Sequence, residues 1–212
     1  MKRIGFLHSL FRKDEKLLIN EFRKYKDIEL VMIDDRKIYF SLDKSPVDVD
    51  CVLERCINHS RALHSLRIFE SFGIRCFNSY KTATICGDKL LTSYALKDAG
   101  IRQPDLRIAF TEESALEAIE ELGYPVVFKP AVGSWGRLIS KVCDQSAAES
   151  IIEHKTILGS YHHSIFYIQK YIEKKNKRDI RTFVVGDEVI AGIYRYNDHW
   201  ITNTARGGKV EN

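Results

Sequence analysis

The stretch that most constrains the fold covers residues 126–142, VVFKPAVGSWGRLISKV. It opens with an apolar run, residues 126–128, of the kind that is typical of a buried strand. Lys129-Pro130 then ends the strand, because proline has no N–H to donate to a neighbouring strand. A loop with two glycines, residues 131–137, leads to a second apolar segment at 138–142. The stretch therefore predicts two strands joined by a glycine loop.

This glycine loop has the composition of a flap over a polyphosphate. Gly133 and Gly136 allow backbone N–H groups to turn toward an anion, because no Cβ blocks a close approach. Lys129 and Arg137 add point and bidentate positive charge, which suits phosphate. The loop lacks the G-x-x-x-x-G-K-[ST] spacing of a P-loop, and no helix pattern follows it. An ordinary hairpin with a glycine turn and exposed lysines fits the same residues, so both interpretations stay open on this stretch alone.

Length and composition narrow the class of protein. The chain has 212 residues, enough for one large domain or two small ones. Its apolar content of 44% and charged content of 29% are ordinary for a soluble globular protein. The net charge of +4 is spread along the chain, without the basic patch typical of a nucleic-acid-binding domain. Five cysteines without a C-x-x-C pair suit reduced thiols, and no apolar run approaches about 18 residues. We therefore expect a cytoplasmic protein with no nucleic-acid or membrane partner.

Strands and helices alternate in the first part of the chain. Strands are expected at residues 2–8, 28–33, 49–53 and 75–77, helices at 14–25 and 60–72, and an optional short strand at 38–40. Alternation of this kind predicts a parallel sheet with right-handed crossovers.

The second part of the chain predicts an α+β module. Helices are expected at 79–84, 88–99, 111–122 and 146–154, and strands at 106–110, 165–172, 180–185 and 189–194. Thr111 suits the N-cap of its helix, and Gly186-Asp187 between two apolar strands predicts a hairpin. The charged residues 174–178 are expected to form a solvated loop, and residues 200–212 either a functional loop or a disordered tail.

Several polar residues outside the glycine loop suit an anionic ligand. Asp88 would cap the helix that starts at Lys89 while the lysine reaches back to the ligand, although a surface lysine fits as well. Asp179 and Arg181 lie two positions apart and so face the same side of a strand, with an exposed ion pair as the alternative. Arg195 ends the next strand, so two arginines would face one site across the hairpin.

Three further stretches leave two interpretations each. Residues 167–172 suit contact with an adenine ring as well as they suit a plain sheet strand. Residues 200–208 bring an amide, a guanidinium and two glycines together, which suits a carboxylate or phosphate as well as a flexible linker. Glu54-Arg55-Cys56 follows the third strand, at the edge where parallel sheets bind ligands. Cys56 has no paired base in the sequence, so a small core residue is favoured over a nucleophile.

Taken in order, these motifs resemble those of an ATP-grasp ligase. They are GDKL at Lys89, VVFKP at Lys129, GSWGR at 133–137, YIQKYI at 167–172, RDIR at 178–181 and RGG at 206–208. The chain is most similar to the RimK-like branch and, within it, to the LysX/ArgX type, the ligases of amino-group-carrier lysine and arginine biosynthesis. This closer similarity is carried by residues 54–56, 86–89, 133–138 and 199–208, and the resemblance covers nearly the whole chain.

The resemblance implies an α/β ATP-grasp fold in three parts. These are an N-terminal Rossmann-like pre-ATP-grasp domain at 1–84, a central α+β ATP-grasp subdomain at 85–164, and an incomplete, β-rich C-terminal subdomain at 165–212. It also implies ATP-dependent amide bond formation, in which a carboxylate becomes an acyl phosphate and an amine attacks it. Phosphoryl transfer of this kind needs positioning and charge neutralisation more than a nucleophilic side chain.

The resemblance further implies the partners of the reaction. The carboxylate would be the C-terminal glutamate of a small acidic carrier protein of the LysW type, and the amine that of 2-aminoadipate or glutamate. The alternatives are a RimK-like ligase that adds glutamate to another protein or to a cofactor, and a nucleotide-binding module without turnover. Each of these three functions is compatible with a homo-oligomer.

Site residues follow from the same resemblance. Those expected to bind ATP are Lys89, Lys129, Gly133, Ser134, Trp135, Gly136, Arg137, Gln169, Lys170, Tyr171, Ile172, Asp179 and Arg181. Those expected to bind the substrate are Arg195, Asn203, Arg206 and Gly207, of which Arg195, Asn203 and Arg206 are also expected to be catalytic. Mg²⁺ is implied as well, but its acidic and amide ligands are expected beyond Asn212, so no metal ligand is assigned here. We therefore expect the 212-residue chain alone to be inactive and prone to aggregate.

Overall fold

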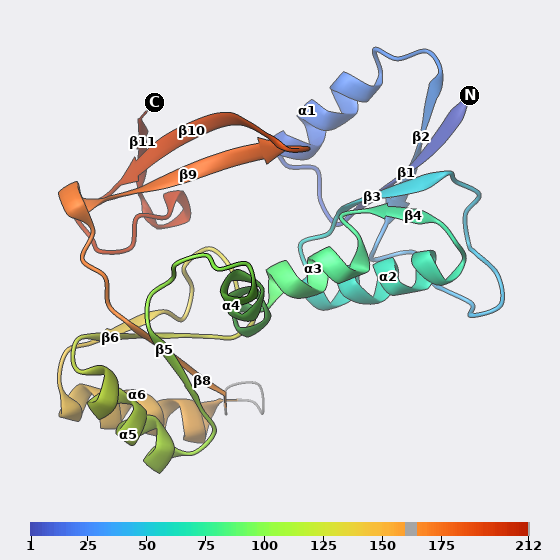
Figure 1. Cartoon of the computed structure of the whole chain (residues 1–212). Coiled ribbons are helices and arrows are strands. Elements are labelled where there is room, and N and C mark those ends of the chain that lie inside the picture. The colour runs from blue at the N-terminus through green and yellow to red at the C-terminus, as the bar shows by residue number, and fades with distance from the viewer. Residues whose placement is uncertain (160–164, 212) are drawn as a thin grey trace. The chain divides into compact units, whose positions relative to one another are not determined.

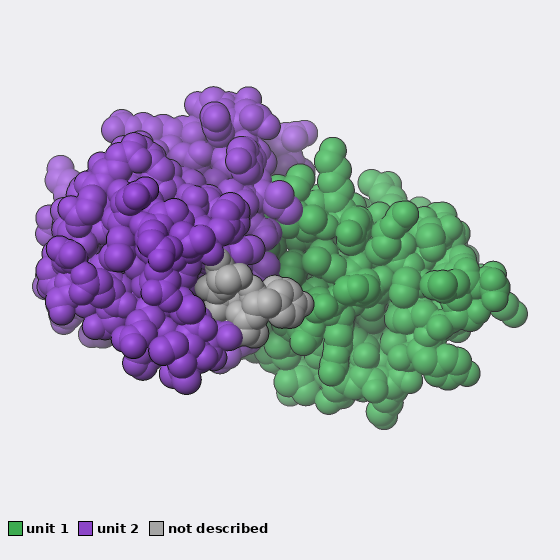
Figure 2. Space-filling view, turned by 90° about the horizontal axis from the view of Figure 1, so that it is seen from below, with its two compact units in different colours: residues 1–87 green, residues 88–212 purple. Residues whose placement is uncertain are grey.

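The chain divides into two units, Met1–Gly87 and Asp88–Asn212, which Figure 2 shows in different colours. The computed structural model describes residues 1–159 and 165–211 (Figure 1). Each unit has a hydrophobic core of its own. No helix in the described part is long and apolar enough to cross a membrane. The finer division into three domains stays a prediction.

Unit 1 is built on a parallel sheet with the strand order β2-β1-β3-β4. Its elements are β1 (Lys2–His8), α1 (Lys13–Phe22), β2 (Ile28–Asp34), β3 (Cys51–Arg55), α2 (His59–Ser71), β4 (Arg75–Phe77) and α3 (Tyr80–Gly87). Figure 1 shows α1 on one side of this sheet and α2 on the other. The predicted parallel α/β architecture of this part of the chain is confirmed.

The core of unit 1 lies between the sheet and α2. Leu7 of β1, Val52 of β3, and Leu66 and Phe69 of α2 are all fully buried there. Each such side chain contributes roughly 1.5–3 kcal/mol through burial. The optional strand at 38–40 is wrong, because these residues form a loop. Their apolar side chains are explained by packing, since Phe40 meets Phe69 edge to face at 5.3 Å between ring centroids.

Unit 2 begins with an antiparallel sheet in the order β5-β8-β6-β7. Its elements are α4 (Lys89–Asp98), β5 (Leu106–Ala109), α5 (Glu112–Leu122), β6 (Val126–Lys129), β7 (Ser140–Val142), α6 (Gln145–Leu158) and β8 (Phe166–Lys170). Figure 1 shows α5 and α6 together on one face of the sheet. Buried side chains from both helices, among them Ile119 and Ile152, meet Phe128 and Phe166 of the sheet. Thr111 caps α5 as predicted, accepting a hydrogen bond from the Ser114 N–H.

The two strands joined by a glycine loop are confirmed in unit 2. Val126 pairs with Val142 and Phe128 with Ser140. The second strand is shorter than predicted, because Leu138 belongs to the loop. Its backbone is left-handed, with φ of 55°, and its side chain is 71% exposed.

A second, smaller sheet completes unit 2. It is antiparallel in the order β11-β10-β9, with β9 (Arg178–Val185), β10 (Glu188–Tyr196) and β11 (Lys209–Glu211). The predicted hairpin turns at Gly186, whose φ is 61°. The loop or disordered tail predicted for residues 200–212 is wrong for β11, which pairs with β10. A strand of only three residues, Lys-Val-Glu, is too short to show an alternating pattern in the sequence.

Candidate functional site

A pocket of about 240 Å³ opens among the loops and strands of unit 2. Its walls come from β6, from β8 and the segment after it, and from the loop after β10. The lining residues are Pro104, Val127, Lys129, Ile139, Gln169, Lys170, Tyr171, Ile172, Lys174, Trp200, Ile201 and Asn203. Six of the residues that the sequence assigned to ATP or substrate therefore line one pocket: Lys129, Gln169, Lys170, Tyr171, Ile172 and Asn203.

Positive charge gathers at this pocket. Lys129 ends β6, and its ammonium donates a hydrogen bond to the side-chain oxygen of Gln169 on β8. Burial lowers the pKa of Lys129, and the nearby charges of Lys89 and Lys174 lower it further. In residues 1–159 and 165–211, neither Lys89 nor Lys129 forms an ion pair with a carboxylate. This charge is left for an anion to neutralise.

Lys89 is held at the base of the glycine loop. Asp88 caps α4, with Oδ1 accepting from the N–H groups of Leu90 and Leu91 at 2.7 and 3.2 Å. The Lys89 N–H donates to the carbonyl of Ala131 at 2.9 Å, and its ammonium donates to the carbonyl of Gly133 at 3.0 Å. Burial lowers the pKa of Lys89 as well. The cap and the reach of the lysine agree with the sequence analysis, and the contact made is with the loop itself.

The glycine loop, residues 131–137, is called the flap below. Gly136 has φ of 67°, and a Cβ there would lie 3.2 Å from Cγ2 of Ile201. The flap thus packs closely against the loop after β10, and glycine is needed for both reasons. The Arg137 guanidinium stacks over the Trp135 ring at 4.7 Å, and Ser134 is exposed. Cationic and aromatic groups therefore sit on a glycine-hinged loop beside the pocket.

In the segment 169–172, which is expected to line the adenine, Lys170 and Tyr171 already contact other parts of unit 2. Lys170 donates to the carbonyls of Leu122 and Gly123, both at 2.8 Å, and so binds the C-terminal end of α5. The Tyr171 ring receives the Lys141 ammonium at 3.9 Å from its centroid. The Lys170 ammonium and the N–H groups of Lys170 and Tyr171, which donate to the carbonyls of Asp105 and Pro125, are therefore already engaged within the chain.

Asp179 organises the residues where the second sheet meets the pocket. Arg195, directly opposite on β10, donates to both carboxylate oxygens, at 2.8 and 2.9 Å. The Thr202 hydroxyl donates to Oδ2 at 2.6 Å, and the Lys174 ammonium lies 3.6 Å from the same oxygen. Burial alone would raise the pKa of Asp179, but these hydrogen bonds lower it overall, so the carboxylate stays charged.

Three predicted site residues, Arg181, Arg206 and Gly207, do not line the pocket. Arg181 is paired with Ile193, is exposed, and lies beside the Phe183 ring at 5.7 Å. Arg206 is exposed in a short helical turn, Thr204–Arg206, and Gly207 follows it with φ of 85°. Asn203, from the same predicted substrate group, does line the pocket.

Lys174 lines the pocket but was not predicted as a site residue, and the buried Thr202 holds its ammonium in place. The solvated loop predicted for residues 174–178 is wrong for Lys174, whose ammonium donates to Thr202 Oγ1 at 2.7 Å and to the Trp200 carbonyl at 3.1 Å. In the sequence, Lys174 cannot be told apart from the other lysines and the arginine of this run, although it is the one that turns toward the pocket.

Two family models together match almost the entire chain. The LysX preATP-grasp domain matches residues 4–85, and the RimK-like ATP-grasp domain matches residues 86–212. The chain belongs to the LysX/ArgX type of RimK-like ATP-grasp ligases. The parallel sheet of unit 1 and the two antiparallel sheets of unit 2 are the arrangement of that fold.

Individual relatives agree with this assignment. The alpha-aminoadipate–LysW ligase LysX of Sulfurisphaera tokodaii is 37% identical over 98% of this chain and 74% of its own length. The glutamate–LysW ligase ArgX of Sulfolobus acidocaldarius is 35% identical over 97% of this chain and 73% of its own. A RimK-domain ATP-grasp protein of Sphaerobacter thermophilus superposes with a TM-score of 0.76 at 27% identity, over 90% of this chain and 71% of that one. A D-alanine–D-alanine ligase of Bacillus anthracis in complex with ATP shares the fold, with a TM-score of 0.68 at 21% identity. That superposition covers 100% of this chain and 70% of the ligase.

The described residues fit a nucleotide better than they fit the metal ion. Lysines without a carboxylate partner and a glycine flap suit the phosphates of ATP in an ATP-grasp protein. By contrast, residues 1–159 and 165–211 contain no group of three His, Cys, Asp or Glu side chains that could hold a metal ion. The Mg²⁺ site that the resemblance implies stays a prediction.

Proposed function

We propose that this protein uses ATP to join the α-amino group of 2-aminoadipate or glutamate to the C-terminal glutamate of a small acidic carrier protein of the LysW type. The carrier carboxylate would first become an acyl phosphate. The names of the LysX and ArgX relatives support the carrier and the two amino acids. The observation that carries the proposal is the pair of ammonium groups of Lys89 and Lys129, which lie at the base of the flap with no carboxylate partner in the described residues.

These two lysines would hold the phosphates of ATP. Both have lowered pKa values because burial disfavours the charged form, and a polyanion beside them would reverse that cost. The flap, with Gly133 through Arg137, would close over the phosphates and exclude water. Residues 169–172 would line the adenine, and Asp179 and Arg181 would continue the nucleotide site.

Arg195, Asn203, Arg206 and Gly207 would bind the substrate side. Arg195 is oriented by its two hydrogen bonds to Asp179, which leaves part of its guanidinium for a carboxylate. Holding the acyl phosphate and the amine in contact is the main task of such a site, because positioning and charge stabilisation supply most of the rate in phosphoryl transfer.

The nucleotide part is tested by titrating ATP into wild type and Lys129→Ala by calorimetry. Loss of a charge-assisted contact should weaken binding by roughly 1.5–3 kcal/mol, or about tenfold to a hundredfold. Lys175→Ala is the control, because Lys175 is an exposed lysine of the same unit. Equal affinity in wild type and Lys129→Ala would remove Lys129 from the site.

The ligase part is tested by mass spectrometry of the carrier after incubation with ATP, Mg²⁺ and either amino acid. A mass increase with only one amino acid identifies the substrate. ADP release that depends on the carrier separates an enzyme from a nucleotide-binding module. The inactivity expected of the 212 residues alone stays a prediction, and the same assay of this chain tests it.

A second candidate is addition of glutamate to a cofactor. A tetrahydromethanopterin:alpha-L-glutamate ligase of Methanococcus maripaludis is 28% identical over 87% of this chain. The LysX and ArgX relatives have higher identity and coverage, so we favour the carrier protein. Glutamate transfer to a pterin cofactor in the same assay, with none to the carrier, would reverse this choice.

A further inference from the structure

Two arginines meet at the carboxyl edge of the sheet in unit 1, outside the pocket described above. Arg12 lies in the loop after β1, immediately before α1, and Arg55 is the last residue of β3. Strands β1 and β3 are parallel neighbours, so both residues reach the same edge. In open sheets of this kind the carboxyl ends of the strands are where ligands bind.

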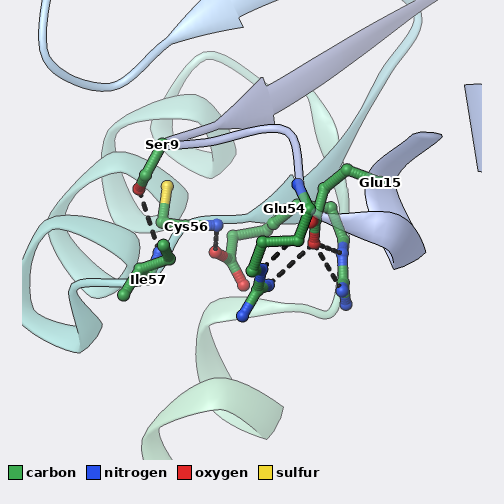
Figure 3. A network of polar contacts seen from close by, with 7 residues as sticks. Ser9, Glu15, Glu54, Cys56 and Ile57 are labelled. Carbon is green, nitrogen blue, oxygen red and sulfur yellow. Dashed lines mark hydrogen bonds and ion pairs between the residues drawn. The ribbon is translucent and has the colours of Figure 1, made fainter.

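A buried carboxylate aligns both guanidinium groups. Glu15 of α1 has no exposed surface, and its side chain is the centre of the hydrogen bonds drawn in Figure 3. Its Oε1 accepts from Arg12 Nη2 at 2.7 Å and from Arg55 Nη2 and Nε at 2.8 and 3.2 Å. Its Oε2 accepts from Arg12 Nε and from the Arg12 N–H, both at 3.0 Å. The two side chains are thereby fixed next to each other.

This cluster keeps a net positive charge. The hydrogen bonds from Arg12, and then those from Arg55, lower the pKa of Glu15 to about 2, so one full negative charge faces two positive ones. Glu54, the chain neighbour of Arg55, accepts from the Cys56 N–H, and burial raises its pKa. In the described part of the chain, no second carboxylate therefore forms an ion pair with either arginine.

Both guanidinium groups have donors left over and can be reached. Each has five N–H donors, and neither Nη1 bonds to a described residue. The side chains of Arg12 and Arg55 are 41% and 31% exposed. Leu10, Phe11 and Ile57, which lie within two residues of one arginine or the other, are 49%, 47% and 38% exposed, so exposed apolar side chains accompany the arginines along the chain.

The backbone that carries the arginines is tied together. The Ile57 N–H donates to Ser9 Oγ at 2.9 Å, which joins the loop after β3 to the loop after β1. The same hydroxyl donates to Asp35 Oδ2 at 2.9 Å, which adds the end of β2. Figure 3 shows Ser9 and Ile57 beside the Glu15 cluster. Donors fixed in this way need little further ordering when an anion binds.

We propose that Arg12 and Arg55 form a carboxylate-binding site on unit 1 for an aliphatic acidic group. Charge, the planar donor fork and the apolar flank fit a carboxylate on a short methylene chain. Such a group is carried both by a free acidic amino acid and by the glutamate terminus of a carrier. The choice of these two ligands rests on the proposed function, whereas the site itself does not.

The test is calorimetric titration of the full chain, without nucleotide, with L-glutamate, L-2-aminoadipate and a synthetic peptide that ends in glutamate. The variants are Arg12→Lys and Arg55→Lys, which keep the charge that Glu15 needs but lose the fork. The control is Arg3→Lys, because Arg3 is an equally exposed, carboxylate-paired arginine in the same sheet, at its other edge. Unchanged circular dichroism spectra and melting curves exclude misfolding.

Each outcome decides the proposal. We expect at least one probe to bind wild type and Arg3→Lys alike, and to bind both other variants about tenfold or more weakly. Weaker binding of the amino acids to the two variants assigns the site to the free amino-acid substrate. Weaker binding of the peptide assigns it to the glutamate terminus of the carrier. Equal binding to all four proteins, or no binding to wild type at millimolar concentration, overturns the proposal. ATP affinity is measured in the same variants and should not change, so failure here is distinct from failure of the nucleotide site.

Discussion

Replacing Glu15 by glutamine should destabilise unit 1 in a pH-dependent way. The hydrogen bonds from Arg12 and Arg55 lower the pKa of Glu15 from 4.5 to about 2. At about 1.4 kcal/mol per pKa unit, this shift corresponds to roughly 3 kcal/mol of stability at pH 7. Both arginines are partly exposed and so partly screened, which reduces the expected loss in Glu15→Gln to about 2–3 kcal/mol. The carboxylate pKa is lowered, so this stability is complete above pH 4.5 and is lost as the pH falls toward about 2.

The assay must report on unit 1 alone. Both tryptophans, Trp135 and Trp200, lie in unit 2, so their fluorescence does not follow the unit that carries the change. Urea unfolding followed by the NMR amide signals of β1 and β3 does, and it works across the pH range. Glu29→Gln is the control, because Glu29 also pairs with an arginine of unit 1, Arg3, but its side chain is 41% exposed. An exposed pair of this kind is worth only about 0–1 kcal/mol.

The reasoning would be refuted by either of two results. One is a difference between wild type and Glu15→Gln of less than about 0.5 kcal/mol at pH 7. The other is a difference that stays constant from pH 7 down to about pH 2, since the lost stability would then not come from ionisation of the carboxylate.

Three further predictions concern unit 2. Burial lowers the pKa of Lys129, so ATP affinity should fall as the pH rises through a value below the ordinary 10.5, and Lys129→Arg should reduce that fall in calorimetry. Gly136→Ala should cost about 1 kcal/mol or more beyond Gly100→Ala in denaturation followed by tryptophan fluorescence. Both glycines have positive φ, so that penalty cancels, but only at Gly136 does a Cβ meet Ile201. Hydrogen exchange of residues 133–137 should slow when a non-hydrolysable ATP analogue is added, and equal rates with and without it would argue against a flap.

The fold was predictable wherever local patterns agree with long-range packing. Apolar runs bounded by turn residues located β1 and β4 to the residue, and Thr111 located the start of α5. Residues 38–40 show how the same signal misleads. They form a short apolar run, but Phe40 packs on Phe69 of α2 from a loop, and residues 38–40 pair with no strand. An apolar pattern in the sequence indicates which side chains are buried. It does not indicate whether those side chains belong to a strand or to a loop.

The sequence was enough to predict which residue types belong to the candidate site, but not how their side chains are arranged. Lys89 and Lys129 stand out because each follows a recognisable boundary, a helix cap in one case and a strand end in the other. Lys174 has no such marker, and its role depends on hydrogen bonds to Trp200 and Thr202, which lie more than 20 residues away. Contacts of that range are set by the register of β9 and β10, and a single sequence does not specify them.

The cationic side chains of the two units differ in whether a carboxylate of the chain pairs with them. This difference affects how each unit binds an anion. In unit 1, Glu15 neutralises one of two arginines and fixes both, so the cluster is ordered before any ligand arrives. In unit 2, Lys89 and Lys129 repel each other and have no carboxylate partner in the described residues. Their mutual repulsion is relieved only by an anion that enters from outside. Either ligand should stabilise its unit by mass action. Relief of the repulsion between the lysines should contribute to the affinity for the nucleotide, whereas the ordered arginines should contribute to the affinity for a carboxylate by lowering the entropy lost on binding.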